Sequence, residues 1–231
     1  MKLIDSHCHL YSDQFSEDVD ACIQRAETLG ISKVVLPNID ESSYQAMMSL
    51  QTKRPDMFFP ALGLHPCSVG RDYKKVLDTM RPKFETNKFV AVGEIGIDLY
   101  WDKTFIKEQI DAFKIQCEWA KEMDLPIIIH VRDSFNECFE ALDEVNSDRL
   151  KGVFHCFGGN KQQAEKALAY GGFYLGLGGV LTFKKSTLPE VVKNIDLKHL
   201  MLETDSPYLA PTPFRGKRNE PSYTYHVAEK L

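Results

Sequence analysis

Residues 106–131, IKEQIDAFKIQCEWAKEMDLPIIIHV, contain both halves of a unit that recurs along the chain. Over residues 106–123 the apolar side chains return at three- and four-residue spacing, which predicts an amphipathic helix. The run Ile127–Val131 that follows is short, apolar and rich in β-branched residues, and it predicts a buried strand. Such strands, alternating with helices, are typical of a parallel sheet covered on its outer side.

The same alternation extends over all 231 residues. Further helical patterns occupy residues 21–29 and 164–170, with glycines where these helices should stop. The strand-like segments are Lys2–Ser6, Lys33–Leu36, Phe58–Gly63, Phe89–Gly93, Ile127–Val131, Gly152–His155, Phe173–Gly176 and His199–Leu202. Eight such units predict an α/β fold, a (β/α)8 TIM barrel, as a single domain over residues 1–231. An open doubly wound sheet is the alternative, because periodicity alone does not reveal closure.

Composition narrows the class of protein. The net charge is −5 and the pI is near 5.8, which argues against broad electrostatic adhesion to nucleic acid or anionic lipid. A phosphodiester would therefore need a locally basic site or a metal. The N-terminus has no signal-peptide pattern, no run is long enough to cross a membrane, and the six cysteines show no framework spacing. These features predict a cytoplasmic protein with reduced thiols, no membrane association and no obligate protein partner.

Polar residues that bind metals follow the predicted strands. The first strand ends in Asp5-Ser6-His7-Cys8-His9, and alternation along an extended chain puts His7 and His9 on one face. Two imidazoles at this spacing can chelate one ion, although His-x-His by itself is a weak signal.

Other strand ends strengthen that signal. Five of the seven histidines lie within a residue or two of a strand end, and in a barrel these ends share the carboxyl-terminal rim, where such enzymes place their chemistry. Convergence on one rim favours a metal or catalytic site over separate structural roles. The candidate metal ligands are His7, His9, Glu94, His130, His155 and Asp205.

The ligand types suggest the chemistry. Four imidazoles and two carboxylates suit zinc, manganese or iron better than an oxygen-only magnesium cage. Six ligands are too many for a single catalytic ion with an open position, so we expect two divalent ions bridged by Glu94. The chain has no Gly-x-Ser-x-Gly motif of a serine hydrolase. Cys8 and Cys156 alternate away from the neighbouring histidines, and we expect both to pack in the interior rather than act as nucleophiles.

The strand-end motifs together resemble the TatD family of metal-dependent deoxyribonucleases, within the amidohydrolase-like superfamily. The resemblance spans nearly the whole chain in order, and its combination of motifs is highly specific. It is carried by IDSHCH (4–9), GEIGID (93–98), HVRD (130–133), HCFGG (155–159), LETDSPYLAP (202–211) and RGKRNEP (215–221).

This resemblance implies a TIM barrel that hydrolyses phosphodiester bonds in DNA, with His65 contacting the scissile phosphate. Family members usually continue through further C-terminal helix, so the last helix of this chain is expected to be short. The implied ligand sets are His7, His9 and Asp205 for one metal, His130 and His155 for the other, and Glu94 between them.

The expected mechanism is attack on phosphorus by a metal-bound hydroxide, with Asp205 and Glu94 as catalytic carboxylates. The metal ions, zinc, manganese or magnesium, would also neutralise charge on the phosphoryl oxygens. Because the chain is acidic, DNA needs a local basic surface. The candidates are Arg132, Lys184, Lys185, Arg215, Lys217 and Arg218. Tyr100, Trp101 and Phe183 either stack on bases or pack the rim.

Three alternatives remain open at this point. An amidohydrolase-type C–N or ester hydrolase would use the same metals on a small cyclic amide, lactone or acylated substrate. A D-aminoacyl-tRNA deacylase would place an ester there with an RNA backbone nearby. A non-enzymatic metal-binding or partner-docking module is the third.

Overall fold

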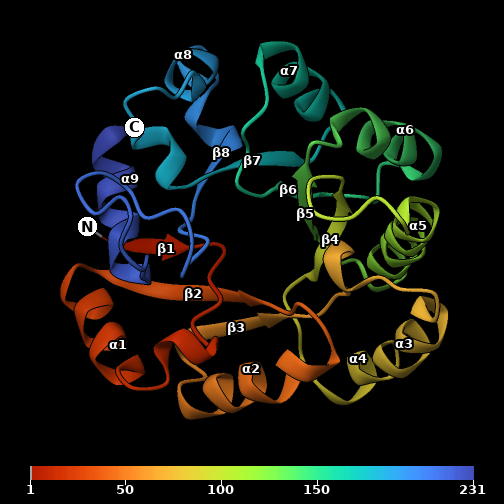
Figure 1. Ribbon diagram of the computed structural model, residues 1–231, viewed down its shortest axis with the longest axis horizontal. Helices are drawn as coiled ribbons and strands as arrows, with labels where there is room; N and C mark the ends of the chain where they lie inside the picture. Colours follow the sequence, from red (N-terminus) through yellow and green to blue (C-terminus); the bar gives the residue numbers. More distant parts are fainter. Residues whose placement is uncertain (1) are drawn as a thin grey trace.

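The computed structural model describes residues 2–231 and has a ring of strands at its centre with helices outside it (Figure 1). Each strand is short and leads into a helix or a helical turn before the next strand begins. The strands are β1 (Leu3–Asp5), β2 (Ile31–Pro37), β3 (Phe58–Ala61), β4 (Val92–Asp98), β5 (Ile127–Arg132), β6 (Gly152–Phe154), β7 (Phe173–Leu177) and β8 (Leu200–Leu202).

The helices cover the outer side of this ring. The α-helices are α1 (Val19–Thr28), α2 (Glu41–Lys53), α3 (Tyr73–Met80), α4 (Lys83–Thr86), α5 (Ile106–Met123), α6 (Phe135–Val145), α7 (Lys161–Ala169), α8 (Leu188–Val192) and α9 (Thr224–Lys230). Short 3-10 helices are η1 (Asp13–Phe15), η2 (Pro66–Ser68), η3 (Gly179–Thr182), η4 (Leu197–His199) and η5 (Pro221–Tyr223). The bounds of α5 coincide with the helix predicted from periodicity. The final helix, α9, has seven residues and packs against β1 and β8.

All strands pair in parallel and in chain order. One sheet runs β1-β2-β3 and the other β4-β5-β6-β7-β8. Two isolated parallel bridges, Leu62 with Val92 and Cys8 with Ser206, join the sheets at both junctions. Sequential parallel order with a link between the first and last strands confirms the (β/α)8 barrel and rejects the doubly wound alternative, whose strand order reverses.

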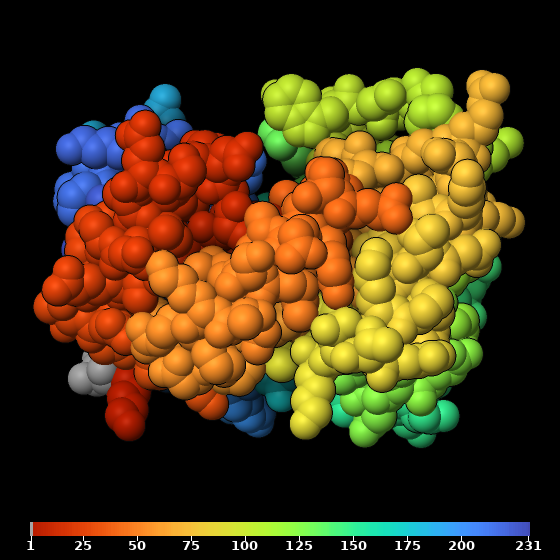
Figure 2. Space-filling view, turned by 90° about the horizontal axis from the view of Figure 1, so that it is seen from below, coloured from red at the N-terminus to blue at the C-terminus, as the bar shows by residue number. Residues whose placement is uncertain are grey.

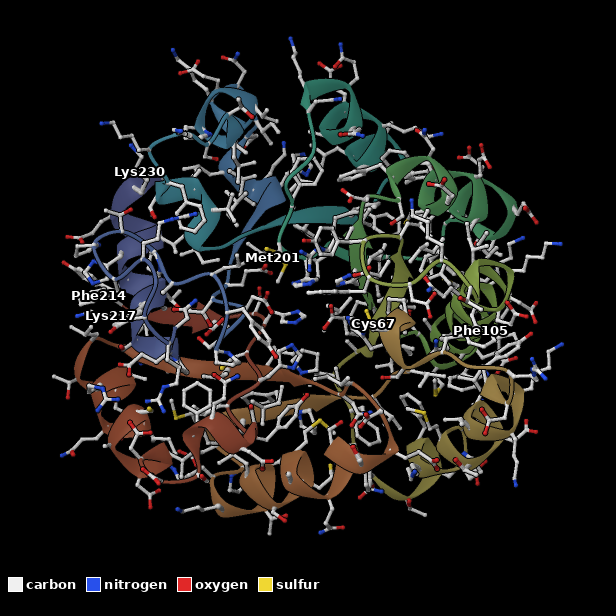
Figure 3. The ribbon with its side chains drawn as sticks, viewed as in Figure 1. Cys67, Phe105, Met201, Phe214, Lys217 and Lys230 are labelled. Atoms are coloured by element: carbon white, nitrogen blue, oxygen red, sulfur yellow. The ribbon has the colours of Figure 1, made fainter. Side chains whose placement is uncertain are left out.

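The core has two parts. A large cluster of buried apolar side chains fills the space between the strands and the surrounding helices. A smaller cluster lies among the strands themselves and consists of Ala61, Ala91, Ile128 and Val153, with Val35 and Met201 packed against it. Met201 is near the middle of the ring in Figure 3. The interior of the barrel is thus filled by side chains, and the chemistry must lie at an end of the barrel.

The largest difference from the predicted strands concerns β4. The apolar run predicted a strand over Phe89–Gly93, whereas β4 begins at Val92 and continues to Asp98, with every residue buried. Its carboxylates therefore lie on the strand rather than after it. Gly96 is needed here because a Cβ at this position would lie 2.0 Å from the His130 carbonyl oxygen, and its φ is +146°.

No helix within residues 2–231 has the length and apolar character needed to cross a membrane. All six cysteines are free thiols, and Cys67 is the exposed one.

Candidate metal centre

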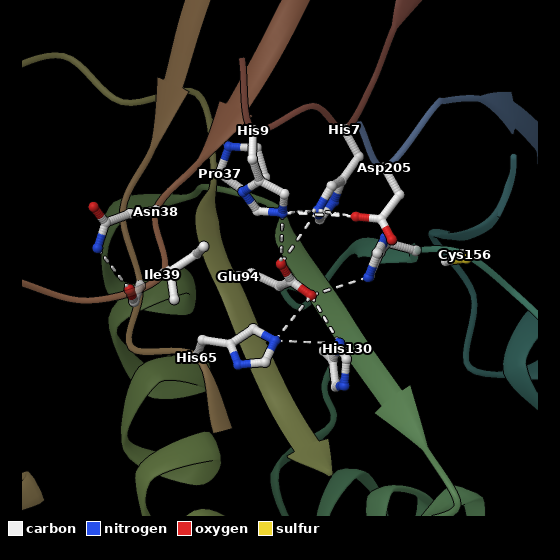
Figure 4. A network of polar contacts seen from close by, with 12 residues as sticks. His7, His9, Pro37, Asn38, Ile39, His65, Glu94, His130, Cys156 and Asp205 are labelled. Atoms are coloured by element: carbon white, nitrogen blue, oxygen red, sulfur yellow. Dashed lines mark hydrogen bonds and ion pairs between the residues drawn. The ribbon is translucent and has the colours of Figure 1, made fainter. Parts of the chain in front are cut away.

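Six of the predicted site residues converge at the carboxyl ends of the strands, around one buried carboxylate (Figure 4). Glu94, on β4, is 2% exposed and stands at the centre of the group. The residues whose nitrogen or oxygen atoms surround its carboxylate are His7, His9, His65, His130, His155 and Asp205. The first and last strands supply His7, His9 and Asp205 because the ring brings β1 and β8 side by side.

The first ligand set faces Oε2 of Glu94. The Nε2 atoms of His7 and His9 lie 3.2 and 3.5 Å from this oxygen, and 3.1 Å from each other. Oδ1 of Asp205 lies 3.7 Å from His7 Nε2 and 3.6 Å from His9 Nε2. Asp205 has a φ of 58°, a left-handed conformation that Asp tolerates better than most residues.

The second set faces the other carboxylate oxygen. Nδ1 of His130 and Nε2 of His155 each lie 2.9 Å from Glu94 Oε1. Nε2 of His65 lies 3.4 Å from the same oxygen and 3.3 Å from His130 Nδ1. Glu94 therefore presents one oxygen to each of two groups of nitrogen atoms.

The chemistry of these donors fits divalent cations. Metal–ligand bonds of about 2.1 Å in a tetrahedron separate the ligand atoms by about 3.4 Å, close to the spacing found in the first set. The ring of His9 is also oriented for this role. Its Nδ1 lies 2.8 Å from the Tyr11 hydroxyl, which donates to the carbonyl of Pro37. The hydroxyl thus accepts the Nδ1 proton, and Nε2 keeps its lone pair for a metal.

A carboxylate orients each histidine of the second set. Nε2 of His130 donates to Oδ2 of Asp98 at 2.8 Å, which leaves the Nδ1 lone pair toward Glu94. Nδ1 of His155 lies 3.4 Å from Oε1 of Glu203, and both side chains are buried. Partners of this kind fix the tautomer and ring orientation of metal-binding histidines.

In the neutral His65 ring, unlike that of His9 or His130, the nitrogen that faces Glu94 carries the proton. Its Nδ1 accepts a hydrogen bond from the backbone N–H of Cys67 at 3.1 Å. In the neutral imidazole the proton then resides on Nε2, the atom that faces Glu94 and His130. Although His65 lies close enough to join the ligand set, this tautomer makes it a hydrogen-bond donor to an anionic group.

The electrostatics of the cluster keep Glu94 ionised. Burial alone would raise the pKa of Glu94, but the surrounding histidines, His155 and His7 foremost, lower it well below its ordinary value. Burial lowers the pKa of His7, and the charge of His155 adds to the effect. Burial raises the pKa of Asp205 to about 6, against the attraction of His155 and His9. Burial opposes the charged form of His155, but Glu94 and Glu203 raise its pKa well above the ordinary value. Metal binding at His155 would therefore displace a proton, because an imidazole must be neutral to ligate a metal.

A cavity of about 940 Å3 opens above this cluster. In Figure 2 the yellow-green segment after β4 stands at the upper edge of the molecule, separated by a notch from the red N-terminal segment. All candidate ligands except the fully buried His7 line its floor, whereas its walls carry cations and aromatic rings. The wall residues include Trp101, Arg132, Phe183, Tyr208, Arg215 and Lys217.

The predicted basic residues separate into three groups, of which Arg218 alone forms the third. Arg132, Arg215 and Lys217 line the cavity, and within residues 2–231 none of them forms an ion pair with a carboxylate. Lys184 and Lys185 are exposed but do not line the cavity. Their contact with DNA stays a prediction, and it would involve nucleotides farther from the cleaved bond.

Arg218 is not available for the substrate. Its guanidinium makes two hydrogen bonds to Asp18, of 2.8 and 2.6 Å, beside α1. The cysteines also differ from each other: Cys8 is buried in the core as predicted, but Cys156 is only partly buried and lines the cavity. The prediction for Cys156 was wrong because the chain turns directly after β6, where its φ is 45° and strand alternation no longer holds.

Sequence reasoning missed the residues that orient the ligands, namely Tyr11, Asp98 and Glu203. Asp98 and Glu203 belong to the quoted motifs, but their partners lie on other strands. Only the register between strands, with Asp98 beside Arg132 and Leu177 beside Leu202, brings them to their histidines.

The fold and the site together define the class, a metal-dependent hydrolase on a (β/α)8 barrel. Residues 4–231 match the family model described as TatD related DNase. The metal-dependent hydrolase YabD of Bacillus subtilis is 37% identical over 230 residues, covering 99% of this chain and 89% of YabD. The crystal structure of YjjV, a TatD homologue from Escherichia coli, superposes with a TM-score of 0.91 at 32% identity, covering 99% of this chain and 88% of YjjV.

A TatD family hydrolase from Entamoeba histolytica, 24% identical, shares the fold with a TM-score of 0.85, covering all of this chain and 90% of that structure. The chain belongs to the TatD family of metal-dependent hydrolases.

Proposed function

We propose that this protein hydrolyses phosphodiester bonds in DNA with the help of two divalent metal ions. The observation that carries the proposal is the position of three cations without carboxylate partners, Arg132, Arg215 and Lys217, on the walls of the cavity above the ligand set. The chain as a whole has a net charge of −5. A local group of uncompensated cations in an acidic protein favours an anionic substrate at this cavity.

The ligand sets divide around Glu94. His7, His9 and Asp205 would hold one ion, and His130 and His155 the other, with one oxygen of Glu94 directed to each. When bound, the ions would lower the pKa of a water molecule and neutralise charge on the phosphoryl group.

The remaining residues bind and orient the substrate. The Nε2–H of His65 is directed into the cluster and would donate to an oxygen of the scissile phosphate. The Arg132 guanidinium would contact a phosphate oxygen from the cavity wall. Asp205 reaches the cavity floor, where its carboxylate would orient the attacking water and accept its proton.

A panel of substrates tests this function. Metal-loaded protein is assayed on a single-stranded oligodeoxynucleotide, bis(p-nitrophenyl) phosphate, dihydroorotate and a D-aminoacyl-tRNA. We expect turnover of the first two. Hydrolysis of the cyclic amide or the aminoacyl ester alone would overturn the proposal in favour of an amidohydrolase or a deacylase, and no turnover at full metal occupancy would favour a binding module.

Two variants test the role of the wall cations. Arg215→Ala removes a charge that could contact phosphate, and we expect its KM for the oligodeoxynucleotide to rise about tenfold. Lys193→Ala is the matched control, because Lys193 is exposed and lies before β8, on the side of the barrel away from the carboxyl ends. Equal KM values for the two variants would mean that Arg215 on the cavity wall does not bind the substrate.

A further inference from the structure

Two aromatic side chains and an arginine form a cluster at the edge of the cavity. The guanidinium carbon of Arg132 lies 3.7 Å from the ring centroid of Tyr100 and 5.2 Å from that of Trp101. The two rings meet edge to face, with centroids 4.8 Å apart. Trp101 is nevertheless 70% exposed and Tyr100 52%, so these rings do not simply pack the rim. We call Tyr100, Trp101 and Arg132 the aromatic platform.

The platform is attached to the metal centre through Asp98. One oxygen of this buried carboxylate, Oδ1, accepts hydrogen bonds from the backbone N–H groups of Tyr100 and Trp101, at 3.0 and 3.2 Å. The other oxygen, Oδ2, accepts the proton of His130 Nε2 at 2.8 Å. The backbone N–H of Asp98 in turn donates to Gln109 Oε1 at 2.9 Å. A single carboxylate thus fixes both a candidate metal ligand and the turn that carries the exposed rings.

Arg132 completes the attachment from the neighbouring strand. It is the register partner of Asp98 across β4 and β5, two residues after His130. Within the described residues its guanidinium has no carboxylate partner, and both rings of the platform lie beside it. The face of an aromatic ring next to an unpaired guanidinium offers a ligand both stacking and charge.

We propose that the aromatic platform binds an unstacked nucleobase of DNA, next to the phosphate that would lie over the candidate metal centre. This proposal rests on the phosphodiesterase function and assigns the residues that hold the base beside the scissile phosphate. Nucleobases stack on exposed aromatic side chains with little sequence preference, while arginine contacts the adjacent backbone. A ring attached to a metal ligand through one side chain holds the base at a fixed distance from the reacting phosphate.

Binding without hydrolysis gives the first test. The chain has two tryptophans, and Trp119 is buried in α5, so a Trp119→Phe variant leaves Trp101 as the fluorescent probe. In EDTA this variant is titrated with a tetrathymidylate and with an abasic tetramer that has the same phosphates. We expect quenching by the tetrathymidylate and a Kd about tenfold lower than that of the abasic tetramer. Absence of quenching, or equal affinities, would overturn the platform.

A second set of variants works in the wild-type background, in case Trp119→Phe is unstable. Trp101→Ala should raise the KM for tetrathymidylate about tenfold and the KM for the abasic tetramer far less, whereas Trp101→Phe should retain most of the affinity. Tyr174→Ala is the control, because Tyr174 is exposed near the start of β7, at the opposite end of the barrel.

The two proposals fail in different ways. If metal-loaded protein cleaves neither tetramer, the phosphodiesterase proposal fails, and the fluorescence titration still decides whether Trp101 binds a base. If both tetramers are cleaved and Trp101→Ala slows both equally, the phosphodiesterase proposal survives and the platform is overturned.

Discussion

Oε1 of Glu203 lies 3.4 Å from Nδ1 of His155, and both side chains are buried at the candidate metal centre. The same oxygen accepts the backbone N–H of Cys156. Gly176, on β7, leaves the space for this carboxylate, because a Cβ there would lie 2.3 Å from Glu203 Oε2. Glu203 therefore contacts the Nδ1 side of the His155 ring and orients Nε2 toward Glu94.

Glu203→Gln should weaken metal binding at His155 while leaving the fold intact. An amide is similar in shape but lacks the negative charge that stabilises the Nδ1 proton, and losses of such partners weaken metal affinity about 10- to 100-fold. Calorimetric titration of the metal-free protein with Zn2+ or Mn2+ measures the change. Glu190→Gln, an exposed position on α8, is the control, and equal affinities in the two variants would contradict the assignment.

Glu94→Ala should affect both ligand sets at once. Each carboxylate oxygen of Glu94 faces a different group of histidines, so its removal takes one ligand from both. We expect bound metal to fall below two equivalents, measured by elemental analysis, and hydrolysis to fall by about 10³-fold. Two equivalents of metal and near-normal turnover in this variant would disprove the bridging role.

Much of the fold could be predicted from local pattern. The helix over residues 106–123 has the correct bounds because one face of it is apolar at every turn. The eight strands are all present, and the error at β4 has a physical reason. This strand is buried on both sides, so its sequence does not alternate between apolar and polar residues. Its two carboxylates lower the local hydrophobicity, and a hydrophobicity pattern therefore predicts a loop there.

The convergence of the candidate metal ligands could be predicted because they lie at or near the carboxyl ends of strands, which meet at one rim in any parallel barrel. The residues that orient these ligands could not be predicted from the sequence. The hydrogen bond from His130 to Asp98 spans 32 residues, and the approach of His155 to Glu203 spans two strands of the ring. Both depend on strand register, and a hydrophobic pattern does not specify register where both faces of a strand are buried.

Removal of metal should lower thermal stability. The candidate ligands lie on β4 and β5 and in the segments that follow β1, β6 and β8, so an ion would link both sheets. A ligand present at 100 times its Kd stabilises the folded state by about 2.7 kcal/mol, which corresponds to a Tm shift of roughly 5–10 °C for a chain of this size. Calorimetric scans with saturating Mn2+ and with EDTA measure this shift. Identical Tm values would argue against binding at these residues.

The C-terminal segment is fastened to α1 by two arginine–carboxylate pairs. Arg218 binds Asp18 through both guanidinium nitrogens, and Arg25 binds Glu220 at 2.6 Å. Arg218 also lies 4.4 Å from the Phe15 ring centroid. Because the chain reaches this segment from Asp205 through the loop after β8, we expect the pairs to hold the carboxyl end of β8 against the start of the chain.

Arg218→Ala should destabilise the protein at neutral pH by about 1 kcal/mol, a modest value because the Asp18 side chain is 34% exposed. The hydrogen bond from Arg218 is the main cause that lowers the pKa of Asp18 from 3.8 to about 2. A carboxylate with a depressed pKa stabilises the folded state above its unfolded pKa, and this contribution is lost as the pH falls through the folded value. The difference in stability between the wild type and Arg218→Ala should therefore be constant above pH 5 and shrink between about pH 4 and pH 2. Urea unfolding at a series of pH values measures this difference.

Lys198→Ala serves as the control, because Lys198 pairs with the exposed Asp196 far from this segment. A difference that stays constant down to pH 2 would mean that Arg218 acts through its packing on Phe15 and not through Asp18.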